Sequence, residues 1–316
     1  MNKFKKIGLT ALASSLVVTS AVAGELTATG AASIGVKDVS KTSTGKGWSM
    51  ANSVTLAGST ELDNGLTVAL SFELDNGTAN GTTSPFDSHS TTISSDAMGT
   101  LVFSGHGGSS AHSALDGTAA GDIWDNTLGI TGPVGAAAGN NSMHYTFPSL
   151  MDGVAVTASY SPGVDVDGTV AAHEGQTSFG LVYTGVEGLS LTYAQGESGA
   201  PLAEVDHTSM KVSYAIGSFT AGYSINDEDK TGASNDEVQS YKLSYTVSDD
   251  LSVSYGSETH ETVGQTTDEE VKQISVSYTT GGVTLTAAQT NASGVTHSAG
   301  ATGDKEKWAL TAAFAF

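Results

Sequence analysis

The sequence predicts an all-β protein, a closed antiparallel barrel of sixteen strands that crosses a membrane. Three observations predict this fold. Short segments that alternate polar and apolar residues recur along the chain, the connections between them are alternately short and long, and an aromatic residue lies at one height in alternate strands. Alternation with a period of two is the pattern of a strand whose two faces meet different surroundings.

The first 23 residues predict an export signal that precedes the fold. Three lysines come before an apolar run from Ile7 to Val18, and a small-residue cleavage site ends at Ala23. A membrane anchor is the alternative, but the run is shorter than the ~20 residues that span a bilayer. We therefore predict a signal peptide at 1–23 and one barrel domain at 24–316.

The composition restricts the class of partner. The 316 residues include no cysteine, and all 12 basic residues are lysines against 33 acidic residues, which gives a formal net charge of −21. Such a chain lacks the phosphate-neutralising surface of a nucleic-acid-binding protein. A cationic or divalent partner fits this charge better.

The strands occur as hairpins, of which "KLSYTVSDDLSVSYGSE" from Lys242 is the clearest. Similar hairpins begin at Leu181, Lys211 and Ser275. Their spacing also fits a solenoid or propeller, but the variable length lies only between hairpins and never in the turns. The predicted strands begin near Glu25, Trp48, Leu66, Thr92, Thr100, Ser142, Val154, Gln176, Leu189, His207, Phe219, Val238, Leu251, Val271, Val283 and Lys305.

The connections alternate in length without exception. Short turns are predicted at 62–65, 97–99, 149–153, 185–188, 217–218, 248–250 and 280–282. Long polar segments are predicted at 37–47, 76–91, 104–141, 161–175, 196–206, 226–237, 257–270 and 289–304. Short periplasmic turns and long extracellular loops are typical of outer-membrane barrels, whereas soluble sandwiches mix their connection lengths.

The aromatic residues indicate which face meets lipid. They share the parity of Leu, Val and Ile and lie about two residues from the short turns, as in the aromatic girdle of a barrel at the bilayer interface. The opposite parity carries small polar residues, such as Gln176, Ser178 and Gly180, which suit a water-filled lumen. The predicted girdle consists of Tyr145, Tyr183, Tyr214, Tyr245, Tyr278 and Phe314.

Three motifs of the chain resemble the trimeric general porins of Gram-negative bacteria, most closely the alphaproteobacterial type. "ELDNGLTV" (Glu61–Val68) resembles their early strand-turn-strand, and "GTLVFSGH" (Gly99–His106) is similar to the strand that enters their constriction loop. "NSMHYTFPSLMDGVAVTASYSP" (Asn141–Pro162) resembles the strands that follow it. The resemblance implies a homotrimer in the outer membrane, in contact with lipid and lipopolysaccharide, with Phe316 read by the barrel-assembly machinery.

The resemblance also implies that segment 104–141 is a third loop folded into the lumen. Porins of this family place arginines around the constriction, but this chain has none, and His106 stands at the start of the loop. We therefore expect a different constriction, with an acidic loop facing lysines near mid-strand height and a transverse field between them. The alternative is that the aspartates are solvated loop charges. The predicted constriction comprises Asp116, Asp122, Asp125 and His106 on the loop and Lys211 and Lys242 on the wall.

No cofactor is expected, because passive diffusion needs none. The acidic outer loops suit loosely bound Ca²⁺ or Mg²⁺ shared with lipopolysaccharide, although "DEDKTG" from Asp227 lacks the twelfth-position carboxylate of a calcium loop. The scattered histidines have no metal-ligand spacing, and no nucleophile elbow accompanies "GHGGSS", so an enzyme is not expected.

The predicted function is a water-filled channel for small hydrophilic solutes and ions, with a preference for cations. Two alternatives remain open. A substrate-selective channel needs an inward ladder of aromatics or of one charge, whereas the lumen positions here are mostly small and neutral. A β-rich surface protein or adhesin without a pore would be purified without detergent.

Overall fold

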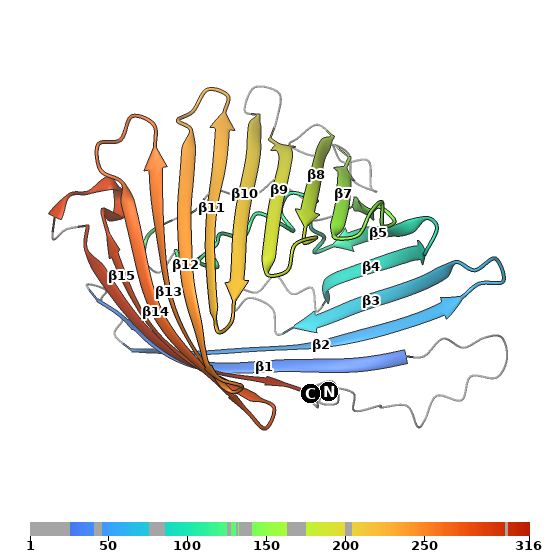
Figure 1. Ribbon diagram of the computed structural model, residues 1–316, viewed down its shortest axis with the longest axis horizontal. Coiled ribbons are helices and arrows are strands. Elements are labelled where there is room, and N and C mark those ends of the chain that lie inside the picture. The colour runs from blue at the N-terminus through green and yellow to red at the C-terminus, as the bar shows by residue number, and fades with distance from the viewer. Residues whose placement is uncertain are drawn as a thin grey trace.

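A computed structural model shows a closed barrel (Figure 1) and describes residues 26–40, 46–75, 86–124, 128–130, 132, 141–162, 175–199, 204–300 and 303–316. The predicted signal peptide and Asp125 lie outside these residues. The strands are β1 (Leu26–Val39), β2 (Gly47–Glu61), β3 (Thr67–Asp75), β4 (Phe86–Ser95), β5 (Gly99–His106), β6 (Ser142–Thr146), β7 (Val154–Ser161), β8 (Gln176–Tyr183), β9 (Leu189–Ser198), β10 (Val205–Ile216), β11 (Phe219–Lys230), β12 (Asp236–Ser248), β13 (Leu251–Thr262), β14 (Glu269–Thr280), β15 (Val283–Ser293) and β16 (Lys305–Ala315), with a short 3-10 helix η2 (Val295–His297).

Every strand pairs antiparallel with its neighbours in sequence, and β1 also pairs with β16. The sheet therefore has no free edge among these strands, and its backbone groups are satisfied within the ring. The predicted fold class, a sixteen-stranded antiparallel barrel with alternating short turns and long loops, is confirmed. Within the described residues, no helix is long and apolar enough to cross a membrane.

The strands begin within two residues of the predicted positions, except that β4 begins at Phe86 and not near Thr92. Some strands were predicted to end too early, at the side of the long loops. β11 continues to Lys230 and β13 to Thr262, because both keep their pairing register through polar residues. Polar side chains end the apolar band but do not break a ladder of backbone hydrogen bonds. The stretch from Asp227 to Lys230 is therefore strand and not the start of a long loop.

The two faces of the sheet differ as the alternation predicts. Along β12, Tyr241, Leu243 and Tyr245 are exposed on the outside, while Ser240 is fully buried within the barrel. Tyr214, Tyr245 and Tyr278 of the predicted girdle are likewise exposed outward, where lipid would cover them. A second outward row, which the sequence interpretation missed, lies nearer the long loops and includes Tyr193, Tyr223, Tyr241, Tyr255 and Trp308.

The ring closes through the last residue. Gly30 N donates to Phe316 O at 2.6 Å, and Phe316 N donates to Gly30 O at 2.9 Å. The phenyl ring lies directly over Gly30, where an added Cβ would come within 2.4 Å of it. A larger residue at this position would have to displace the ring of Phe316 from β1.

Candidate pore constriction

After β5, residues 107–124 lie inside the barrel, and Figure 1 shows their blue-green trace running from β5 across the interior. Four wall serines on β7, β8, β11 and β12 accept hydrogen bonds from the backbone of this segment, at 2.9 Å from Ala111, 3.2 Å from His112, 2.8 Å from Ala119 and 2.9 Å from Ala120. We call these residues the serine ladder: Ser159, Ser178, Ser224 and Ser240. They follow the loop from one strand to the next and satisfy backbone donors that the lumen would otherwise leave to water.

Small residues beside the ladder let the loop approach the wall closely. A Cβ added to Gly180 would lie 2.4 Å from Leu115, and one added to Gly256 would lie 2.9 Å from the Cβ of Ala120. These distances are shorter than van der Waals contact. The loop therefore packs against wall backbone at these two positions.

A buried carboxylate from β13 holds the turn of the loop. Glu258 is 1% exposed, accepts from the hydroxyl of Thr118, and accepts from Trp124 N at 3.0 Å. The turn is also braced internally, because Thr118 N donates to Asp122 Oδ1 at 2.9 Å and Asp122 N donates to Thr118 Oγ1 at 2.8 Å. A charge this deep is tolerated only with such donors.

Apolar packing holds the loop beyond this turn. Leu128 and Ile130 are both completely buried. They pack in a cluster with wall residues of β14 and β15, and Val39 and Trp124 cover its margin. We call this cluster the apolar cushion: Ala120, Ile123, Leu128, Ile130, Val271, Ala292 and Val295.

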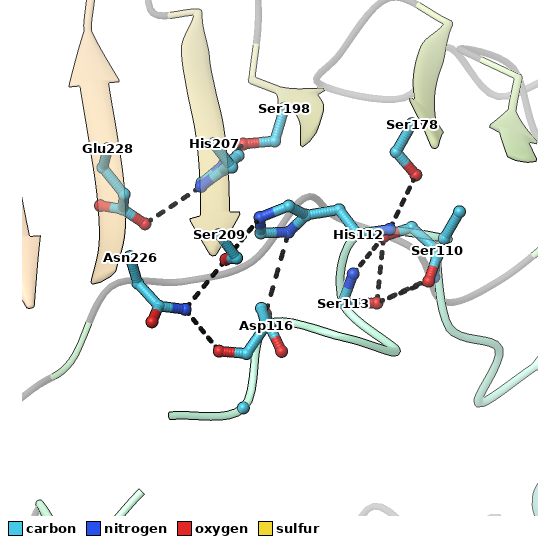
Figure 2. A network of polar contacts seen from close by, with 12 residues as sticks. Ser110, His112, Ser113, Asp116, Ser178, Ser198, His207, Ser209, Asn226 and Glu228 are labelled. Atoms are coloured by element: carbon cyan, nitrogen blue, oxygen red, sulfur yellow. Dashed lines mark hydrogen bonds and ion pairs between the residues drawn. The ribbon is translucent and has the colours of Figure 1, made fainter. Parts of the chain in front are cut away.

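A polar network lies under the first part of the loop (Figure 2). His112 Nε2 contacts Ser209 Oγ at 3.0 Å, and Asn226 Nδ2 donates to Ser209 Oγ at 2.9 Å and to the backbone carbonyl of Asp116. Behind them, His207 lies 3.3 Å from Glu228. These contacts join the loop to β10 and β11.

Burial favours the neutral form of both titratable groups on the loop side of this network. Burial, and next the neighbouring His207, lower the pKa of His112 to about 4. Burial, and next the charge of Asp122, raise the pKa of Asp116 to about 6. The two groups are 3.9 Å apart, from Nδ1 of His112 to Oδ2 of Asp116.

The structure brings two of the predicted loop carboxylates together. Asp116 and Asp122 interact electrostatically across the turn, and Asp122 is exposed. Asp125 lies outside the described residues. His106, at the end of β5, is exposed and its Nδ1 lies 2.5 Å from the carbonyl of Asp87, so the described contacts tie it to the rim and not to the two aspartates.

The expected position of the lysines was wrong. Lys211 Nζ donates to the carbonyl of Gly117 at 2.6 Å, and Lys242 Nζ lies 3.9 Å from the Cβ position of Gly121. Both lysines are on the lumen face, but on the wall that the loop covers. Lys211 anchors the loop backbone and Lys242 lies beside the loop, so neither lysine faces the loop across the pore.

Three lysines on the lumen face of β1 and β16 were missed. Val39 packs on the apolar cushion, so its side of β1 is the inner side, and Lys37 shares that side. Lys307 pairs directly with Val39, and Lys305, of the same parity, has its Nζ 3.0 Å from the Cβ position of Gly129. Lys305 and Lys307 lie an odd number of residues from Trp308, which the sequence places on the outer face. This spacing could have assigned the two lysines to the inner face from the sequence.

Comparisons with known proteins agree with this architecture. A family model described as "Gram-negative porin" matches residues 8–316. A porin structure refined at 1.8 Å resolution has a TM-score of 0.68 and 16% identity, and the match covers 92% of this chain and 100% of that one. A triple mutant of Rhodopseudomonas blastica porin has a TM-score of 0.68 and 15% identity, with the same coverage. A comparison with curated proteins gave no significant match.

At these identities the solved structures show the fold, while the family model covers nearly the whole chain. The family and its fold are those of channels and not of enzymes. The chain therefore belongs to the Gram-negative porin family and is an outer-membrane channel protein.

Proposed function

We propose that this porin passes small hydrophilic solutes and ions by passive diffusion and prefers cations. One observation carries the proposal: the third loop docks along the lumen wall with the Asp122 side chain exposed and that of Asp116 27% exposed. The loop narrows the lumen, and its carboxylates place negative charge beside the remaining water. A cation passing within a few ångströms of them is attracted, and an anion is repelled.

The positive counterpart in this proposal is the lysine group of β1 and β16. Lys37, Lys305 and Lys307 share the inner face and lie near the far part of the loop, whereas the aspartates lie near its turn. A solute between the two groups would meet charge of both signs at different positions in the lumen. Asp125 and His106 remain predicted members of the constriction.

Membership of the porin family supports a proposal for the partners. We propose a homotrimer in contact with outer-membrane lipid and lipopolysaccharide, whose terminal Phe316 is read by the barrel-assembly machinery and whose signal peptide is removed after Ala23. We also propose weak binding of Ca²⁺ or Mg²⁺ at the acidic extracellular rim, where the exposed carboxylates of Glu197, Glu204 and Asp206 lie within 4.8 Å of one another. Mass spectrometry of the mature chain and of the native complex tests cleavage and trimerisation.

Single-channel recording in a planar bilayer under a salt gradient tests the function. We expect conductance in three equal steps per insertion and a reversal potential that favours cations. An anion-favouring potential would contradict the assigned role of the loop carboxylates. Silence of detergent-folded protein would contradict the open channel itself.

A further inference from the structure

The long loop between β15 and β16 turns inward and reaches the third loop. Its short helix η2 places Val295 in the apolar cushion, where this residue is 3% exposed. Val295 follows the end of β15 and is not part of a strand. The apolar cushion therefore joins the third loop to a second loop as well as to the barrel wall.

The two loops meet at Gly129. A Cβ added to Gly129 would lie 3.2 Å from Cγ1 of Val295 and 3.0 Å from Nζ of Lys305. The φ of Gly129 is +81°, in a region that glycine adopts without a steric penalty. The residues on either side, Leu128 and Ile130, are both 0% exposed. The third loop thus lacks a side chain at the point where Val295 covers it.

The turn that carries Val295 has an unfavourable backbone conformation. Thr296 and His297 have φ values of +57° and +55°, in a region that a β-branched residue such as threonine rarely adopts. Such strain persists only where the surrounding structure imposes it. The turn would therefore relax if its supporting contacts were lost, and Val295 would move with it.

The supporting contacts come from the start of β14 and the residues just before it. Thr296 N donates a hydrogen bond to Oε1 of Glu269 at 2.7 Å, and Nδ1 of His297 lies 2.9 Å from the carbonyl oxygen of Thr267. Glu269 is only 7% exposed, so water competes little for its carboxylate. A buried acceptor on the wall therefore supports the strained turn.

We propose that η2 is a latch for the third loop, with Val295 as its positioning residue and Glu269 as its support. The latch holds residues 128–130 in the apolar cushion. The pore width therefore depends on the loop between β15 and β16 as well as on the third loop itself. This inference rests on the proposed channel function and deepens it, because the third loop narrows the lumen.

Thiol labelling measures release of the third loop without requiring ion flow. The chain has no cysteine, so Ile130→Cys introduces a single reporter at a position that is 0% exposed in the docked loop. A charged methanethiosulfonate reagent should label this reporter slowly in detergent-folded protein that is otherwise wild type. Adding Val295→Ala should increase the labelling rate about tenfold, because two buried methyl groups are lost.

A second variant tests the support of the turn without changing the apolar contact. Glu269→Leu removes the acceptor for Thr296 N, so the turn should relax and labelling should accelerate as it does with Val295→Ala. Glu269→Gln keeps an acceptor oxygen and should label more slowly than Glu269→Leu. Val263→Ala is the matched control, because Val263 is 66% exposed in the loop between β13 and β14.

Three outcomes would overturn the latch: an unchanged labelling rate in Val295→Ala, an unchanged rate in Glu269→Leu, or an equal increase in Val263→Ala. Failure of the proposed function gives a different result. Wild-type protein that is silent in a planar bilayer, while labelling still depends on Val295 and Glu269, would contradict the channel function and leave the latch intact.

Discussion

The two parts of the third loop are held to the same wall by different forces. The first part, residues 109–124, is fixed by hydrogen bonds to the serine ladder, Glu258 and the histidine network. The second part, residues 128–130, is fixed by apolar burial, with Leu128 and Ile130 wholly enclosed. Hydrogen bonds are directional, so they determine which loop atom contacts which strand. Apolar contacts are not directional, so they hold the loop close to the wall without fixing which residues are opposite each other. Variants in each part separate these roles.

The largest effect is expected at Glu258. Replacing it with Leu removes the acceptor for Thr118 and Trp124, and each buried donor left without a partner costs about 1–3 kcal/mol, so the docked loop should lose about 4 kcal/mol. Single-channel recording should then show a larger, noisy conductance. Glu258→Gln retains an acceptor and serves as the matched control; equal noise in both variants would contradict the role of the carboxylate in positioning the loop.

A smaller loss is expected in the apolar cushion. Leu128→Ala removes buried side-chain volume and should cost about 3 kcal/mol of docking free energy. Because no charge is involved, the excess current noise should be independent of salt concentration. Leu62→Ala is the control, because Leu62 is an exposed residue in the short turn between β2 and β3. Noise that varied steeply with salt would indicate an electrostatic attachment instead.

Removal of one ladder hydroxyl should have a modest effect. Ser224→Ala leaves Ala119 N without its 2.8 Å acceptor, which should cost about 1 kcal/mol. The loop should remain docked, and hydrogen exchange at the Ala119 amide should increase while that at Ala111, which binds Ser159, stays unchanged. A uniform increase along the loop would show that the ladder acts as one cooperative unit.

The smallest structural change and the clearest electrical one are expected at Asp122. Asp122→Asn keeps the Oδ1 acceptor for Thr118 but removes an exposed charge, so conductance should hardly change while the cation preference falls, more at low salt than at high salt. Asp249→Asn, in the exposed turn between β12 and β13, controls for net charge. An equal fall in both variants would assign selectivity to the whole surface and not to the loop.

The barrel could be predicted from the sequence because its determinants are local. Alternation along a strand such as β12 and the length of the adjacent turn decide which side chains point outward and how neighbours pair. The start of β4 was misplaced because Phe86 to Thr91 alternate weakly. The second outward aromatic row, nearer the long loops, was missed because the sequence analysis compared aromatic residues only at the height of the short turns.

The anchoring of the loop could not be predicted in the same way. A serine that faces water and one that accepts a loop amide have the same parity and the same polarity, so Ser178 and Ser240 gave no sign of the ladder. Lys211 was assigned correctly to the inner face but to the wrong side of the pore, since parity along a strand does not say which part of the wall the loop covers. That choice depends on contacts between residues far apart in the chain.

The contact between Phe316 and Gly30 forms only when β1 and β16 are both in place. The two strands that form this seam, β1 and β16, are the first and sixteenth of the barrel, so all sixteen strands must be present before the seam can be sealed. A polypeptide cut short anywhere within β16 would leave β1 with unpaired backbone in lipid, which is costly. The closing contact thus discriminates between finished and unfinished molecules, and a bulkier residue in place of Gly30 should yield full-length chains that remain accessible to periplasmic proteases.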